Sequence, residues 1–199
     1  MTDHTFYLLR HGETEFNVAG RLQGQQDSPL TARGRAQARA HGVLLRDLIA
    51  APASWRVVAS PLGRTLDTAR LACAELGLPE AAIETDPRLM EIAYGEWEGQ
   101  TYDEIEAYYP DHWAARERDP WGFVVPRGES YAMVAARAQA FLNEPRGNTI
   151  VVSHGGTGRV LRGLYARLAP PEMRTLEQPQ DALHRLTQGT IARIDHAEG

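Results

Sequence analysis

The chain has 199 residues, of which 43% are hydrophobic and 24% charged, and it carries a net charge of −5. This length suits one domain with a sizeable core, and the negative charge disfavours nucleic acids and anionic membranes as partners. All 21 basic residues are arginines and there is one cysteine, which excludes lysine-based catalysis, an internal disulfide and a multi-cysteine metal site.

Short apolar runs that alternate with helical patterns predict the secondary structure. In chain order we expect a strand at 6–9, a helix at 31–49, a strand at 56–59, a helix at 65–76, a strand at 83–85, helices at 102–109 and 130–142, a strand at 149–153 and a helix at 157–168. Pro110 and the pair Pro170-Pro171 are among the residues expected to separate these elements.

The end of the chain differs from this alternation. Runs at 182–187 and 190–194 flank Gln188-Gly189 and predict a β-hairpin. The pattern as a whole predicts an α/β fold, a three-layer αβα sandwich. Its central sheet is mainly parallel, with helices on both faces and the hairpin at one edge.

We expect residues 1–199 to form a single domain. Within it, residues 95–129 are irregular and rich in aromatic residues, proline and charge, which favours either an insertion over a site or an extra surface pair of helices. The aromatic side chains of this insertion are expected to form a small satellite core. The polar residues 2–5 and the lack of a long apolar run favour a cytoplasmic protein.

Polar groups follow three of the predicted strands at the point where each strand ends. The first strand runs into Arg10 and His11, the second is followed by Arg64, and the fourth runs into His154. Because the carboxyl ends of parallel strands meet at one edge of a sheet, these side chains should lie together near helix N-termini. Two guanidiniums and two imidazoles there would bind an anion, and a histidine could act as a nucleophile.

Several motifs also occur in a characteristic order along nearly the whole chain. They are Leu9-Arg10-His11-Gly12-Glu13-Thr14, Asn17, Arg21-Leu22-Gln23-Gly24, Ser60-Pro61 through Arg64, Glu91 with Gly95 and Glu98-Gly99, and Ser153-His154-Gly155-Gly156. Their order and spacing resemble the histidine phosphatase superfamily, in its phosphoglycerate-mutase-like branch.

The resemblance implies a role for each matching residue. His11 would be the nucleophile that becomes phosphorylated, and Glu91 the general acid and then the base. Three further residues would hold the phosphoryl group: Arg10, Arg64 and His154. Asn17 would bind substrate too, through the phosphate, and the other residues implied on the substrate side are Gln23, Gly24, Tyr94 and Gly155. The resemblance implies no metal ion and no other cofactor.

Hydrolysis is favoured over the mutase reaction, because mutases of this family are longer and carry a lysine after the acid glutamate. The carboxylates of Glu96 and Glu98 are also expected to disfavour a doubly charged substrate. Arg116, Arg118 and Arg127 could compensate for these charges, although Arg116 and Arg118 are interpreted as part of a solvated face. Arg127 is interpreted as a residue that could reach a substrate anion.

The expected activity is therefore that of a histidine acid phosphatase-type phosphomonoesterase acting on a small phosphoester. The alternatives are a cofactor-dependent phosphoglycerate mutase and, outside enzymes, a phosphoanion-binding scaffold. The substrate and the oligomeric state stay open, a homodimer being one candidate.

Overall fold

The computed structural model describes residues 4–144 and 147–196, and its centre is a six-stranded sheet in the order β3-β2-β4-β1-β5-β6. The strands are β1 (Phe6–Arg10), β2 (Arg56–Ala59), β3 (Ile83–Thr85), β4 (Thr149–Ser153), β5 (Ala182–Thr187) and β6 (Thr190–Asp195). The first four are parallel, whereas β5 and β6 form an antiparallel hairpin at one edge. Gln188 and Gly189 in its turn have φ values of 50° and 76°, as the favoured two-residue turn requires. The predicted sheet is confirmed.

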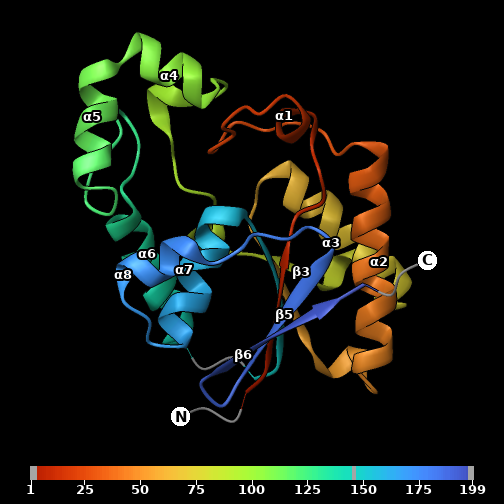
Figure 1. Ribbon diagram of the computed structural model, residues 1–199. Coiled ribbons are helices and arrows are strands. Elements are labelled where there is room, and N and C mark those ends of the chain that lie inside the picture. Colours follow the sequence, from red (N-terminus) through yellow and green to blue (C-terminus); the bar gives the residue numbers. More distant parts are fainter. Residues whose placement is uncertain (1–3, 145–146, 197–199) are drawn as a thin grey trace.

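Helices cover both faces of the sheet (Figure 1). The α-helices are α1 (Glu15–Val18), α2 (Ala32–Leu48), α3 (Gly63–Glu75), α4 (Tyr102–Tyr108), α5 (Pro110–Arg118), α6 (Tyr131–Leu142), α7 (Gly155–Tyr165) and α8 (Pro170–Thr175). Short 3₁₀ helices lie at Pro52–Ser54, Glu80–Ala82, Pro87–Leu89 and Gly95–Trp97. No helix in the described part of the chain has both the length and the apolar content that crossing a bilayer requires.

The two hydrophobic cores follow from the alternation of side chains along the central strand β1. Tyr7 and Leu9 pack in the cluster that includes residues of α2 and α3. Phe6 and Leu8 pack in the cluster that includes residues of α6 and α7. Because β1 is buried on both faces, it fixes the position of the residues that follow its carboxyl end.

Two prolines mark helix starts where the sequence predicts only interruptions. Pro110 is the first residue of α5, and Pro170 the first of α8. Proline suits this position because its missing N–H would have no partner in the first turn of a helix. The breaks expected at these prolines are confirmed, and each proline also begins a further helix, α5 or α8.

The segment 95–129 has a small core of its own, with Trp97, Ile105 and Val125 fully buried. The partly buried side chains around it are Leu22, Tyr94, Tyr109, Trp113 and Phe123. Tyr108 is instead exposed, and Trp121 packs on the main core. In Figure 1, α4 and α5 stand across from α1 at the end of the molecule toward which β1 runs.

Candidate active site

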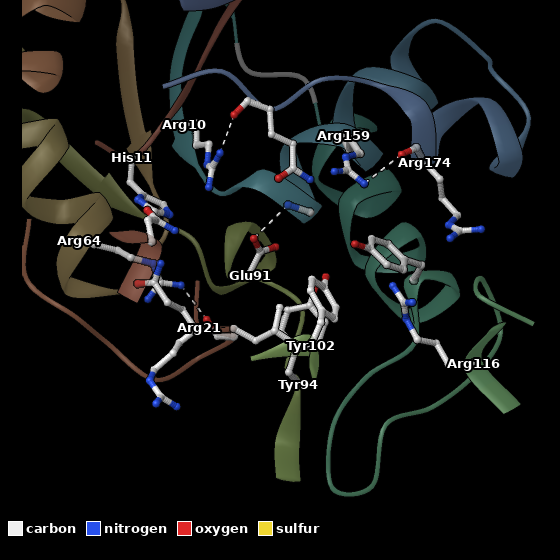
Figure 2. Close-up of a pocket in the computed structure, with 17 residues that line it drawn as sticks. Arg10, His11, Arg21, Arg64, Glu91, Tyr94, Tyr102, Arg116, Arg159 and Arg174 are labelled. Carbon is white, nitrogen blue, oxygen red and sulfur yellow. Dashed lines mark hydrogen bonds between the residues drawn. The ribbon is translucent and has the colours of Figure 1, made fainter. Parts of the chain in front are cut away.

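A cavity of about 190 Å³ opens where β1 and β4 end (Figure 2). The residues from the sequence prediction that line it are Arg10, His11, Asn17, Gln23, Gly24, Arg64, Glu91 and Tyr94. His154 and Gly155 instead line a small neighbouring cavity, which they share with Arg10. The His154 ring still lies against His11, with 5.3 Å between the ring centroids. The parallel sheet thus brings the predicted residues together.

The imidazole of His11 is held in one tautomer. Its Nδ1 lies 2.8 Å from the carbonyl oxygen of Gly12, and because a carbonyl only accepts, Nδ1 must carry the proton. In the neutral ring, Nε2 then carries a free lone pair. The backbone N–H of His11 donates to the carbonyl of Ser153, and the backbone N–H of Gly12 donates to the hydroxyl of Thr68. These two hydrogen bonds fix the backbone on both sides of the peptide bond between His11 and Gly12.

His11 is also kept neutral. Burial lowers its pKa well below the ordinary value, and the positive charges of Arg10 and Arg64 lower it further. His154 has its pKa lowered in the same way, by burial first and then by Arg64. A neutral imidazole with a free nitrogen is the form that can attack phosphorus.

The two guanidiniums beside His11 are anchored from behind. Arg10 donates through Nη1 to the carbonyl of Gln178 at 2.5 Å. Arg64 is fully buried and donates to the carbonyls of Gly24 and Gln26 at 2.6 and 2.7 Å, and to the Asp27 carboxylate at 3.1 Å. These bonds fix the direction of both cations, as preorganised anion binding requires.

Glu91 is gripped by backbone donors from the start of α7. Its carboxylate accepts from the N–H of Gly156 at 3.0 Å and of Thr157 at 2.9 Å, and from its neighbour Ile92 at 3.0 Å. These three donors fix the position of the carboxylate beside the start of α7. Figure 2 shows Glu91 facing the interior of the cavity. Its geometry therefore suits proton transfer to and from a bound molecule.

The far part of the cavity is rich in arginines that were not among the residues predicted for the site. Arg116 is one of them, and its guanidinium lies over the ring of Trp113 at 4.9 Å from the centroid. The interpretation of Arg116 as part of a solvated face was therefore wrong, whereas Arg118 is exposed. The additional arginines that line the cavity are Arg21, Arg116, Arg159 and Arg174.

The acidic residues of the insertion do not line this cavity. Glu98 accepts from the backbone N–H groups of Gln25, Gln26 and Tyr94, and Glu96 pairs with Arg127. Neither carboxylate is therefore at the surface of the cavity, where it would repel a second anionic group directly. Glu91 is the only carboxylate among the described residues that line the cavity.

Arg127 does not reach the cavity. Its side chain is 81% exposed and its nearest acidic partner is Glu96, at 3.1 Å. Its backbone has a φ of 59°, in the left-handed region that favours glycine. The idea that Arg127 contacts a substrate anion is not supported, and the residue occupies a strained turn instead.

Some of the missed residues left a signal in the sequence and others did not. Arg159 comes four residues after Gly155 in the same helix, so it faces the same edge of the sheet one turn later. Arg174 belongs to α8, which the sequence did not predict. The remaining unassigned lining residues are Leu22, Tyr102, Tyr131, Gly156 and Gln178.

Within the described ranges, no group of three or more histidine, cysteine or acidic side chains could hold a metal ion.

The buried histidines make stability depend on pH. Burial lowers the pKa of His41 to about 3 and that of His184 to about 4, and those of His11 and His154 fall as well. In the unfolded chain each histidine binds a proton near pH 6.5, whereas in the folded protein it binds one only at lower pH. Each histidine therefore lowers the free energy of unfolding by up to about 1.4 kcal/mol for every pH unit below 6.5. We expect the free energy of unfolding in urea to fall between pH 7 and pH 5.

A His41→Asn variant provides the comparison, because it removes one of the histidines whose pKa is lowered and should flatten the slope. A free energy of unfolding that stays constant or rises from pH 7 to pH 5 would contradict this account.

Sequence comparisons place the chain among phosphoryl-transfer proteins. The family model described as "Histidine phosphatase superfamily (branch 1)" matches residues 6–191. The 6-phosphofructo-2-kinase/fructose-2,6-bisphosphatase 1 of Mus musculus is 33% identical over 189 residues, which cover 94% of this chain and 38% of that protein. The chain thus spans less than two fifths of that relative. The Erwinia tasmaniensis protein named "Probable phosphoglycerate mutase GpmB" is 34% identical over 197 residues, 96% of this chain and 85% of that protein.

Solved structures share the whole fold. The alpha-ribazole phosphatase from Shigella flexneri has a TM-score of 0.81 and 27% identity, with 98% of this chain and 96% of that chain covered. A mycobacterial glucosyl-3-phosphoglycerate phosphatase has a TM-score of 0.77 and 27% identity, with 98% and 99% covered. The similarity therefore extends from the sheet to the helices that cover it.

Proposed function

Because the chain belongs to branch 1 of the histidine phosphatase superfamily, we propose that it hydrolyses phosphomonoesters through a phosphorylated His11, without a metal ion. The observation that carries this proposal is the state of the His11 ring. Its Nδ1–H is donated to Gly12, it lies at the cavity between Arg10 and Arg64, and burial lowers its pKa, which favours the neutral form. This combination supplies a nucleophile and fixed positive charges at one point.

In the first step, the lone pair on His11 Nε2 forms a bond to phosphorus while the bond to the ester oxygen breaks. Glu91 in its protonated form donates the proton that the leaving oxygen needs. Arg10 and Arg64 stabilise the charge on the phosphoryl oxygens during the transfer. The product alcohol leaves, and the phosphoryl group stays on His11.

In the second step, a water molecule attacks the phosphorus of phosphohistidine, and the bond to Nε2 breaks. The carboxylate of Glu91 accepts the proton of the water as the new bond forms. Inorganic phosphate leaves with His11 and Glu91 restored to their starting states.

The distribution of charge in the cavity supports a substrate with a second anionic group. Arg116, Arg159 and Arg174 lie on the side of the cavity away from His11 (Figure 2). Glu91 is the single acidic side chain in the described lining, and it is engaged by the backbone of α7. Arginines bind phosphate and carboxylate groups through paired hydrogen bonds. Fructose 2,6-bisphosphate and glucosyl-3-phosphoglycerate, which relatives are named for, both carry such a second group.

A panel of phosphoesters compared by kcat/KM tests the proposal. It contains p-nitrophenyl phosphate, fructose 2,6-bisphosphate, glucosyl-3-phosphoglycerate and α-ribazole phosphate, each with and without EDTA. We expect hydrolysis that EDTA does not change, and the highest kcat/KM for a doubly anionic substrate. Tight phosphate binding without turnover would instead favour the scaffold.

Arg116→Met tests the second anionic group directly. For the best doubly anionic substrate we expect KM to rise about tenfold or more, because a lost charged hydrogen bond is worth about 1.5–3 kcal/mol. The kcat/KM for p-nitrophenyl phosphate should stay within about twofold, since this substrate has no second anion. Arg118→Met is the matched control, and equal losses on both substrates would argue against the subsite.

The phosphoglycerate mutase reaction is the second candidate, because the same arginines could hold the second phosphate of a bisphosphoglycerate. Incubation with 3-phosphoglycerate and 2,3-bisphosphoglycerate decides between the two. Rapid formation of 2-phosphoglycerate would mean that the mutase reaction, and not hydrolysis, is the main activity.

A further inference from the structure

The loop between α8 and β5, residues 176–181, lies directly against the phosphoryl site. The carbonyl of Gln178 accepts from Arg10, as described above. Two residues later, Nε2 of Gln180 lies 3.0 Å from Oδ1 of Asn17 and 3.3 Å from the carbonyl oxygen of His11. Both of these atoms are acceptors, so the amide nitrogen of Gln180 donates to each.

The side chain of Asn17 is consequently held in one orientation. Its Oδ1 accepts from Gln180 Nε2 and from the backbone N–H of Thr14, which is 3.2 Å away. An amide rotated by half a turn would place its NH₂ group against these two donors, which is unfavourable. The Nδ2 end is therefore turned away from both donors, and Asn17 lines the cavity.

We infer that Gln180 is a positioning residue that holds the Asn17 amide so that its N–H donors face the phosphoryl group. This inference rests on the proposed function, which puts a phosphoryl group on His11. The orientation matters because N–H donors stabilise the phosphoryl oxygens, whereas an amide oxygen in the same place would repel them.

Gln180→Glu is the sharpest test, because it keeps the shape of the side chain and replaces the donor with an acceptor. The new carboxylate faces two acceptors, Asn17 Oδ1 and the His11 carbonyl. Rotation of the Asn17 amide would relieve the first of these contacts and turn Oδ1 toward the phosphoryl group. We expect kcat/KM for p-nitrophenyl phosphate to fall about tenfold to a hundredfold, and Kd for orthovanadate to rise by a similar factor.

A double-mutant cycle separates this effect from that of the added negative charge. In an Asn17→Ala background, Gln180→Glu should change kcat/KM and the orthovanadate Kd by less than about threefold. Gln180→Met removes the donor without adding charge, and its effect should depend on Asn17 in the same way. Thermal unfolding of each variant shows that the fold is intact.

Losses of equal size in the presence and absence of Asn17 would overturn the inference. They would mean that the charge itself, or the contact with the His11 carbonyl, is responsible. If the unmodified protein binds orthovanadate but hydrolyses no phosphoester, the proposed function fails. In that case the double-mutant cycle measured by the Kd for orthovanadate still tests whether Gln180 acts through Asn17.

Discussion

Replacing His11 with alanine should reduce kcat on the order of 10⁴-fold or more and abolish the phosphorylated intermediate. The loss is this large because no neighbouring group can substitute for the free Nε2 atom. His154 is the only other histidine packed against it among the described residues, and its Nε2 lies 2.8 Å from the hydroxyl of Ser60. Rapid quenching with a ³²P-labelled substrate would detect phosphohistidine, which is labile in acid and stable in base.

The His11→Ala variant should still bind inorganic phosphate, because Arg10 and Arg64 keep their anchors in the backbone. His112→Ala is the matched control, since His112 is exposed on α5 and does not line the cavity. Near-normal turnover in His11→Ala, or a phosphoryl group trapped on another residue, would show that the nucleophile is assigned incorrectly.

The parts of the fold that the sequence predicted correctly are those with a strong local pattern. The run 149–153 is apolar and buried on both faces, and it forms β4 within the same limits. The turn at Gln188-Gly189 carries its own signal. By contrast, α5 and α8 are short and begin at prolines. Proline is common both at the first position of a helix and just after the end of one. Local sequence alone could not decide between these two positions.

For the site, too, only some of the residues could be predicted from the sequence. Residues that follow strand ends, such as His11 and Arg64, could be brought together because the predicted strands are parallel. Arg116 could not, because its place depends on how the insertion packs and on the ring of Trp113 beneath its guanidinium. Gln180 could not be found either, because its role depends on a hydrogen bond to a residue 163 positions away.

The contact between Glu91 and the start of α7 leaves no room for a side chain at Gly156. A Cβ atom built there would lie 2.8 Å from Oε1 of Glu91, closer than such atoms approach in real structures. The carboxylate cannot move aside freely, because the N–H groups of Ile92 and Thr157 hold the same oxygen. A side chain at this position therefore displaces the proposed acid and base.

We expect Gly156→Ala to lower kcat by about a hundredfold, the cost of a misplacement of about 1 Å in a catalytic group. Formation and breakdown of the phosphohistidine both need Glu91, so single-turnover kinetics should show both steps slowed. Binding of inorganic phosphate should change less, because Arg10 and Arg64 do not touch Gly156 in the observed geometry.

Gly158→Ala provides a control in the same turn of the same helix. A Cβ at Gly158 meets only Leu8 Cδ2 at 3.9 Å, which is an ordinary contact, so activity should stay close to normal. Alanine stabilises a helix interior by roughly 0.5–1 kcal/mol relative to glycine, so Gly158→Ala should also raise the melting temperature slightly. Equal activity in the two alanine variants would mean that Glu91 tolerates the displacement, and that its position does not limit either chemical step.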